Sequence, residues 1–131
     1  MYSMYLLINA AVHGNVSFTL LRMDGTCAEQ KTYSGQNKDV ILHLVDFLQE
    51  TKIEKEAIAG IGLVEGVGGF TSTRIATLIA NTFAYVRRIP VLGISEVQFA
   101  HPTNKIVLQF VNQSAGVLLH PTYSGEPNIR M

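Results

Sequence analysis

One stretch of this chain, residues 57–95, limits the possible folds more than any other. It joins an apolar run (IAGIGLV), a glycine-rich turn (EGVGGFTSTR), a long helical pattern and, after Pro90, a second apolar run (VLGIS). Short apolar runs bounded by turn residues are typical of buried strands. A strand, a helix and another strand in succession predict an α/β domain.

The turn in this stretch has two interpretations. Gly66, Gly68 and Gly69 allow a sharp turn or the close approach of a ligand. The hydroxyl residues 71–73 can cap the helix that follows, and a helix N-terminus attracts anions. The glycine spacing matches neither dinucleotide-binding nor P-loop motifs, since a third glycine and a lysine are missing. A structural turn is therefore favoured over a phosphate-binding one.

The helix predicted from Thr71 to Arg88 has two contrasting sides. At 100° per residue, its bulky side consists of Ile75, Leu78, Ile79, Thr82, Phe83 and Val86. Its small side consists of Thr73, Ala76, Thr77, Ala80 and Ala84. We expect the bulky side to pack on the sheet and the small side to face a partner helix, because small side chains let another backbone approach closely. The alternative is that alanine is simply a good helix former on an exposed surface.

The length fits a single domain, and the charge balance leaves no net positive charge that would attract nucleic acid. The chain has 131 residues, and its ten basic residues balance its ten acidic ones. The only cysteine, Cys27, cannot form an internal disulfide, so we expect an inert buried thiol in a cytoplasmic protein. The apolar N-terminus lacks the basic region of a signal peptide and is too short to span a bilayer. It predicts a strand.

The N-terminal third predicts three antiparallel strands. Tyr5–Ala11 and Val16–Met23 are apolar runs separated by a turn at His13-Gly14-Asn15. Asp24-Gly25 then closes a tight turn into Cys27–Ser34. With the two later strands, this meander predicts a mixed five-stranded sheet with packed helices.

A first helix follows Asp39, which can cap it. Its apolar residues cover an arc wider than one packing surface demands. They are Val40, Ile41, Leu44, Val45, Phe47 and Leu48. We therefore expect this helix to take part in a contact with another molecule, through Val40, Leu44 and Phe47.

The C-terminal part carries weaker signals. Glu96–Ala100 predicts a helical turn, whereas residues 105–111 and 116–120 predict a hairpin. Residues 121–131 have two prolines, a glycine and no periodicity, so an irregular tail is expected. The predicted organisation is one α/β domain over residues 1–100, with a hairpin and a tail attached over 101–131.

Side chains that would support catalysis or metal binding are sparse. His13, His43, His101 and His120 lie in separate segments without the spacing of a zinc site. Glu65 is the only acid well placed beside the glycine turn, and phosphoryl transfer requires more than one carboxylate for magnesium. We therefore expect no enzyme activity, no catalytic residue, no metal and no cofactor.

The glycine turn resembles a motif of the TsaB (YeaZ) family. Residues 66–74 (GVGGFTSTR) are similar to the family's G-P-G-S-F-T-G-L-R, and residues 89–95 (IPVLGIS) to its I-P-V-V-G-V-S. The matching motif positions are Gly66, Gly68, Phe70, Thr71 and Arg74. Asn9 stands where the family commonly has an aspartate, and Val67, Gly69 and Ser72 replace its proline, serine and glycine. The resemblance implies an actin-like, sugar-kinase-like (ASKHA, ribonuclease-H-like) fold.

The same resemblance implies a function. Members of the family are non-catalytic subunits that bind a TsaD-type catalytic protein, together with a TsaE-type ATPase, to make threonylcarbamoyladenosine (t6A) in tRNA. Their two helices pair with the same helices of the partner, so we expect this chain to form a homodimer in isolation. We expect it to contact tRNA only through the complex, and we expect no membrane contact. Full-length members continue into a second domain that this chain is too short to hold. The expected interface residues are Val40, Leu44, Phe47, Thr73, Ala76, Thr77, Ala80 and Ala84.

Two alternatives stay open. One is a nucleotide- or phosphate-binding enzyme of the same fold that uses Gly66 to Thr71, with Glu65 assisting. The other is a homodimeric interaction module that serves an unrelated process.

Overall fold

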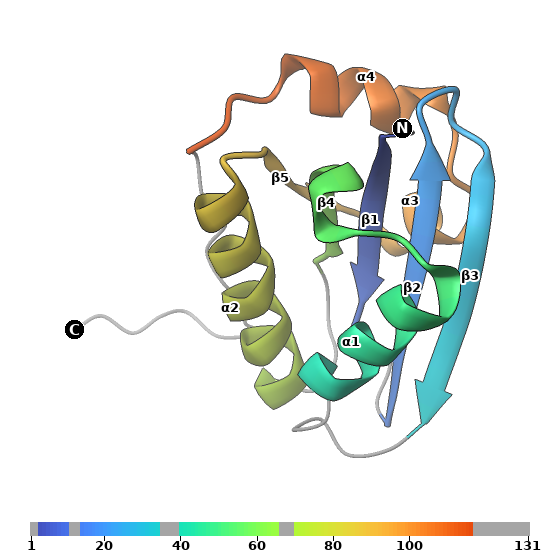
Figure 1. The fold of residues 1–131 in the computed structure, drawn as a ribbon, viewed down its shortest axis with the longest axis vertical. Coiled ribbons are helices and arrows are strands. Elements are labelled where there is room, and N and C mark those ends of the chain that lie inside the picture. Colours follow the sequence, from blue (N-terminus) through green and yellow to red (C-terminus); the bar gives the residue numbers. More distant parts are fainter. Residues whose placement is uncertain (1–2, 11–13, 35–39, 66–69, 117–131) are drawn as a thin grey trace.

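The computed structural model describes residues 3–10, 14–34, 40–65 and 70–116, without the side chains of residues 70–73. The described part contains five strands and four α-helices, and Figure 1 shows how they are arranged. The elements are β1 (Met4–Asn9), β2 (Asn15–Arg22), β3 (Cys27–Ser34), α1 (Val40–Thr51), a 3₁₀ turn (Lys55–Ala57), β4 (Ile58–Val64), α2 (Phe70–Arg87), β5 (Val91–Ile94), α3 (Glu96–Ala100) and α4 (Asn104–Asn112). The strands and the helices α1, α2 and α3 lie where the sequence predicted them. The predicted Asp39 cap and the glycine turn at 66–69 lie outside the described residues.

The sheet is mixed, as predicted, with strand order β3-β2-β1-β4-β5. β1 pairs antiparallel with β2 and parallel with β4, so Leu6 lies opposite both Leu20 and Ile61. β2 pairs antiparallel with β3, and β4 pairs parallel with β5. The predicted turn between β2 and β3 is present, with Gly25 at a φ of 91° that favours glycine.

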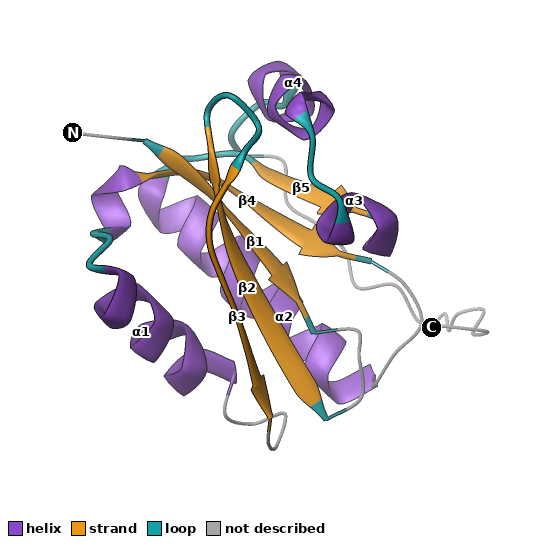
Figure 2. Ribbon diagram, turned by 90° about the vertical axis from the view of Figure 1, so that its right-hand side faces the viewer, coloured by secondary structure: helices purple, strands orange, loops and turns teal. Residues whose placement is uncertain are grey.

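Helices cover both faces of the sheet. Figure 2 shows α1 and α2 on one side and α3 and α4 on the other. The first core lies under α1 and α2 and includes Leu6, Phe18 and Leu63 from the sheet. The second core lies under α3 and α4 and includes Leu7 and Val64. Successive side chains of a strand point to opposite faces, which is how β1 supplies both cores.

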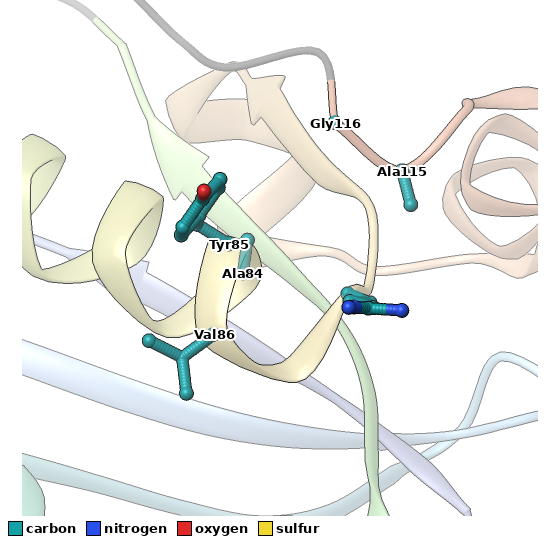
Figure 3. A pocket seen from close by; sticks show the side chains of 6 residues that line it. Ala84, Tyr85, Val86, Ala115 and Gly116 are labelled. Carbon is teal, nitrogen blue, oxygen red and sulfur yellow. The ribbon is translucent and has the colours of Figure 1, made fainter.

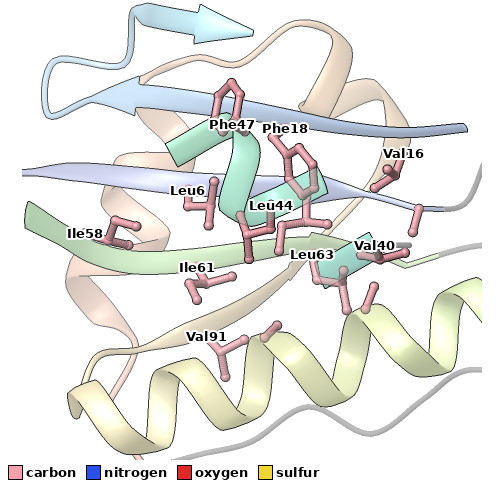
Figure 4. Close-up of a cluster of buried hydrophobic side chains, with 14 of the residues drawn as sticks. Leu6, Val16, Phe18, Val40, Leu44, Phe47, Ile58, Ile61, Leu63 and Val91 are labelled. Atoms are coloured by element: carbon pink, nitrogen blue, oxygen red, sulfur yellow. The ribbon is translucent and has the colours of Figure 1, made fainter. Parts of the chain in front are cut away.

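α2 is turned over relative to the prediction. Ala76, Ala80 and Ala84 face the first core and are 0%, 0% and 2% exposed. The sheet already fills this space with large side chains, labelled in Figure 4, including those of Leu6, Ile61 and Leu63. Interiors are close-packed, so a helix that crosses such a surface at short distance must present small side chains to it.

α4 replaces the first strand of the predicted hairpin, so the prediction of a strand at residues 105–111 is wrong. The predicted second strand at 116–120, beyond residue 116, and the predicted tail at 121–131 lie outside the described residues. The ring of Phe110 stacks on that of Tyr5, with centroids 4.2 Å apart and planes 2° from parallel. Gly60 lies beneath both rings, and a Cβ there would come within 2.8 Å of Phe110 Cδ1. The glycines of β4 therefore make room for an aromatic residue from α4.

Both long helices end with a basic residue in the left-handed conformation. In α1, Lys52 has a φ of 60°, and the N–H of Ile53 donates to the carbonyl of Leu48 with an N to O distance of 3.1 Å. α2 ends in the same way at Arg88, whose φ is 58°. This is the Schellman arrangement, in which glycine is the usual residue.

Candidate protein-interaction surface

The residues predicted to contact a partner lie inside the chain. Val40, Leu44 and Phe47 of α1 and Ala76, Thr77, Ala80 and Ala84 of α2 are all buried. The side chain of Thr73 lies outside the described ones. The predicted outward orientation is therefore wrong for seven of the eight residues, because their side chains are covered by the chain's own sheet and helices.

The surplus of the α1 arc faces outward instead. Ile41, Leu42 and Val45 are large aliphatic residues, and they are 54%, 65% and 48% exposed. The wide apolar arc thus exceeds one packing surface, as the sequence indicated. The exposed apolar residues are neighbours of the buried ones on the helix, and they are not the residues that the sequence analysis selected.

α1 has two different flanks. The flank toward β3 is polar and occupied: Lys31 Nζ lies 2.7 Å from Glu50 Oε1, and the rings of Tyr33 and His43 stack with centroids 4.6 Å apart. Hydrogen bonding to Glu50 raises the pKa of Lys31. At ~100° per residue, Ile41 and Val45 lie roughly half a turn away from this flank, on the side of α1 that approaches α2.

α2 adds further exposed aliphatic side chains. Leu78 and Val86, predicted to pack on the sheet, are 67% and 70% exposed. Ile75 and Ile79, on the same side of the helix as Val86, are half-buried against the first core. α1 and α2 contact each other, so we name Ile41, Leu42, Val45, Leu78 and Val86 the helix-pair face. Scattered apolar residues are common on surfaces, whereas a set gathered on adjacent helices marks an interaction site.

The alternative site lies at another edge of the domain. The carboxyl ends of the parallel strands β1, β4 and β5 share this edge, where Asn9 and Glu65 lie. Asn9 is nearly buried, and Glu65 is exposed with its carboxylate against Gly93, where a Cβ would overlap it. No group of three metal-ligating side chains occurs among the described residues. The glycine turn itself lies outside them, so phosphate binding there stays untested.

Two other expectations concern the surface. Cys27 is exposed in β3, so the prediction of a buried thiol is wrong; β3 is an edge strand, and a side chain there can face solvent. In the part of the chain that the structure describes, no helix is both long and apolar enough to cross a membrane.

Comparisons with known proteins concern the fold. No sequence model of a protein family and no curated protein matches the chain. Two solved structures from Pseudomonas aeruginosa are similar to it: YeaZ, and an uncharacterised protein with similarity to the peptidase YeaZ. The chain has a YeaZ-like fold.

The similarity has the same strength for both structures. Each has a TM-score of 0.61 and 24% sequence identity, over 71% of this chain. The chain covers 44% of YeaZ and 43% of the uncharacterised protein, so it spans less than half of their length. The resemblance to the TsaB (YeaZ) family is thereby confirmed for the fold, and the mixed sheet with packed helices agrees with an actin-like, ribonuclease-H-like domain.

Proposed function

We propose that this chain is a non-catalytic interaction subunit that binds a TsaD-type catalytic protein through the helix-pair face. In this role it would belong to the t6A-forming assembly of tRNA, with a TsaE-type ATPase, and would meet tRNA only through its partners. The proposal rests on the exposed aliphatic side chains of α1 and α2 and on the YeaZ-like fold.

The helix-pair face has the chemistry of a protein contact. Its five side chains are aliphatic, and the ion pair of α1 lies on the opposite flank. Buried aliphatic area stabilises a complex by about 25 cal/mol per Å² before the cost of association is subtracted. A partner that presents a similar pair of helices would bury this surface in a four-helix contact.

The test is to mix the full chain with a TsaD-type protein and measure the mass of the complex by light scattering. Leu78→Arg places a charge within the helix-pair face, and we expect binding to weaken by about 30-fold or more, as for a hot-spot residue of an interface. Leu108→Arg is the matched control, because Leu108 is 57% exposed on α4, on the other side of the sheet. This variant should bind like the wild type.

Each outcome separates the candidates. A complex with the TsaD-type protein that Leu78→Arg abolishes and Leu108→Arg preserves supports the proposal. A dimer of the chain alone that responds in the same way, without binding of the TsaD-type protein, favours the homodimeric module. Equal binding by wild type and Leu78→Arg would overturn the proposed surface.

A further inference from the structure

A cavity lies at the C-terminal end of α2. Its volume is about 520 Å³, within the range of small-ligand pockets. It is lined by Ala84, Tyr85, Val86, Arg88, Ala115 and Gly116. Figure 3 shows that Tyr85 and Val86 leave the last turn of α2 in different directions. Val86 lines the cavity and is also part of the helix-pair face, whereas Tyr85 lines the cavity alone.

Arg88 supplies the cavity with a positive charge. Within the described residues, its guanidinium has no hydrogen bond or ion pair. The neighbouring Arg87 differs, because its guanidinium donates to the backbone carbonyls of Lys55 and Glu56 at 3.3 and 3.2 Å. Arg87 is thus engaged in holding the end of α2, whereas the donors of Arg88 are available to a ligand.

The other walls are largely apolar. Tyr85, which is 72% exposed, contributes an aromatic ring, and Ala115 contributes a methyl group. An arginine and an aromatic ring that line one cavity suit a planar anion, because the guanidinium binds a carboxylate through two parallel hydrogen bonds while the apolar body of the ligand covers the ring.

The number and place of the charges narrow the ligand further. Arg88 is the only basic residue among the described lining residues, and it stands at a helix C-terminus, where the helix dipole is negative. Such a site disfavours a multiply charged phosphate group. We propose that this cavity binds a singly charged carboxylate attached to an apolar or aromatic group, with Arg88 holding the carboxylate and Tyr85 the apolar body.

The test uses benzoate as the probe, titrated into the isotopically labelled full chain and followed by amide chemical shifts. A ligand of this size should bind with a Kd on the order of 1 mM. We expect saturable shifts at residues 84–88 and 115–116. Benzamide, which has the same shape without the charge, should bind at least about tenfold more weakly, as expected for the loss of a charge-assisted hydrogen bond.

Variants decide whether the named side chains act. Arg88→Gln should weaken benzoate binding at least about tenfold, and Tyr85→Ala should weaken it as well. Lys52→Gln is the matched control, since Lys52 ends α1 in the same left-handed conformation away from this cavity. It should bind benzoate like the wild type. Absence of saturable shifts, equal binding of benzamide, or unchanged binding by Arg88→Gln would each overturn the proposal.

Discussion

The two helical layers solve the same packing problem in opposite ways. Under α1 and α2 the sheet presents large aliphatic side chains, and α2 packs against them with the small side chains of Ala76, Ala80 and Ala84. Under α4 the sheet presents Gly60, and the large ring of Phe110 packs over it. The difference teaches that the side of a helix that becomes buried depends on the volume the sheet leaves free, and not on side-chain hydrophobicity alone.

This complementarity has a consequence for the surface. Because α2 buries its small side, its large aliphatic residues Leu78 and Val86 stay exposed, as do Ile41 and Val45 of α1, the helix that α2 contacts. α4 also exposes Leu108 and Val111, but it buries the aromatic residue that anchors it. The helix-pair face is therefore a by-product of close packing that a partner can use.

The strongest test of this comparison is to introduce an arginine on the buried side of α2 in one variant and on its exposed side in another. Ala80→Arg would force a guanidinium into the first core, and we expect it to lower the free energy of unfolding by at least about 3 kcal/mol or to prevent folding. Leu78→Arg, on the exposed side, should change it by no more than about 0.5 kcal/mol. Urea unfolding monitored by circular dichroism measures both. A destabilised Leu78→Arg beside a stable Ala80→Arg would mean that α2 is oriented as the sequence alone suggested.

A second test concerns the other layer. Phe110→Ala removes the ring that stacks on Tyr5 above Gly60, and it should cost about 3 to 5 kcal/mol of stability. Leu108→Ala, on the exposed side of α4, should cost no more than about 0.5 kcal/mol. Hydrogen exchange of α4 amides would show whether the loss is local to this layer. Similar effects of the two variants would contradict the seating of α4 through Phe110.

The smallest expected effect concerns the polar flank of α1. The hydrogen bond to Glu50 raises the pKa of Lys31 above its ordinary 10.5 in the folded protein. A base with a raised folded pKa contributes stability that is present below its unfolded pKa and lost as the pH rises through the folded pKa. Wild type should therefore lose more stability above about pH 10.5 than Lys31→Met.

The comparison with the variant is needed because tyrosines titrate in the same range. Burial raises the pKa of Tyr5, and it is also the largest cause of the raised pKa of Tyr33. Deprotonation of either tyrosine therefore also lowers the stability of the folded protein at alkaline pH. Thermal unfolding of the two proteins between neutral and alkaline pH measures the difference. If the stability of the two proteins fell in parallel as the pH rose, the Lys31–Glu50 pair would not stabilise the contact between β3 and α1.

Local patterns in the sequence were sufficient for most of the fold. The runs of apolar residues, the Asp24-Gly25 turn and Pro90 placed the five strands and the two long helices. The exception was residues 105–111, a short apolar segment that suits a strand or a helix equally well. The presence of the YeaZ-like fold followed from the glycine motif and from the sequence after Pro90, and the solved structures agree with it.

The sequence predicted that both long helices carry surplus apolar surface, but it predicted the wrong residues for it, and binding of a partner there stays a prediction. The sequence indicated that both helices carry more apolar surface than one packing face needs, and Ile41 and Val45 were part of the arc on α1. The small row of α2 was assigned to a partner because small residues permit close approach between helices. In the structure the close approach is to the chain's own core.

The sequence by itself determined which segments become strands and helices and that the two long helices are apolar beyond the needs of one contact, since these follow from local periodicity. Only the tertiary structure decided which side of each helix is buried. That choice depends on side chains far away in the sequence, the large residues of one sheet face and the glycines of the other, whose volumes the helix must complement.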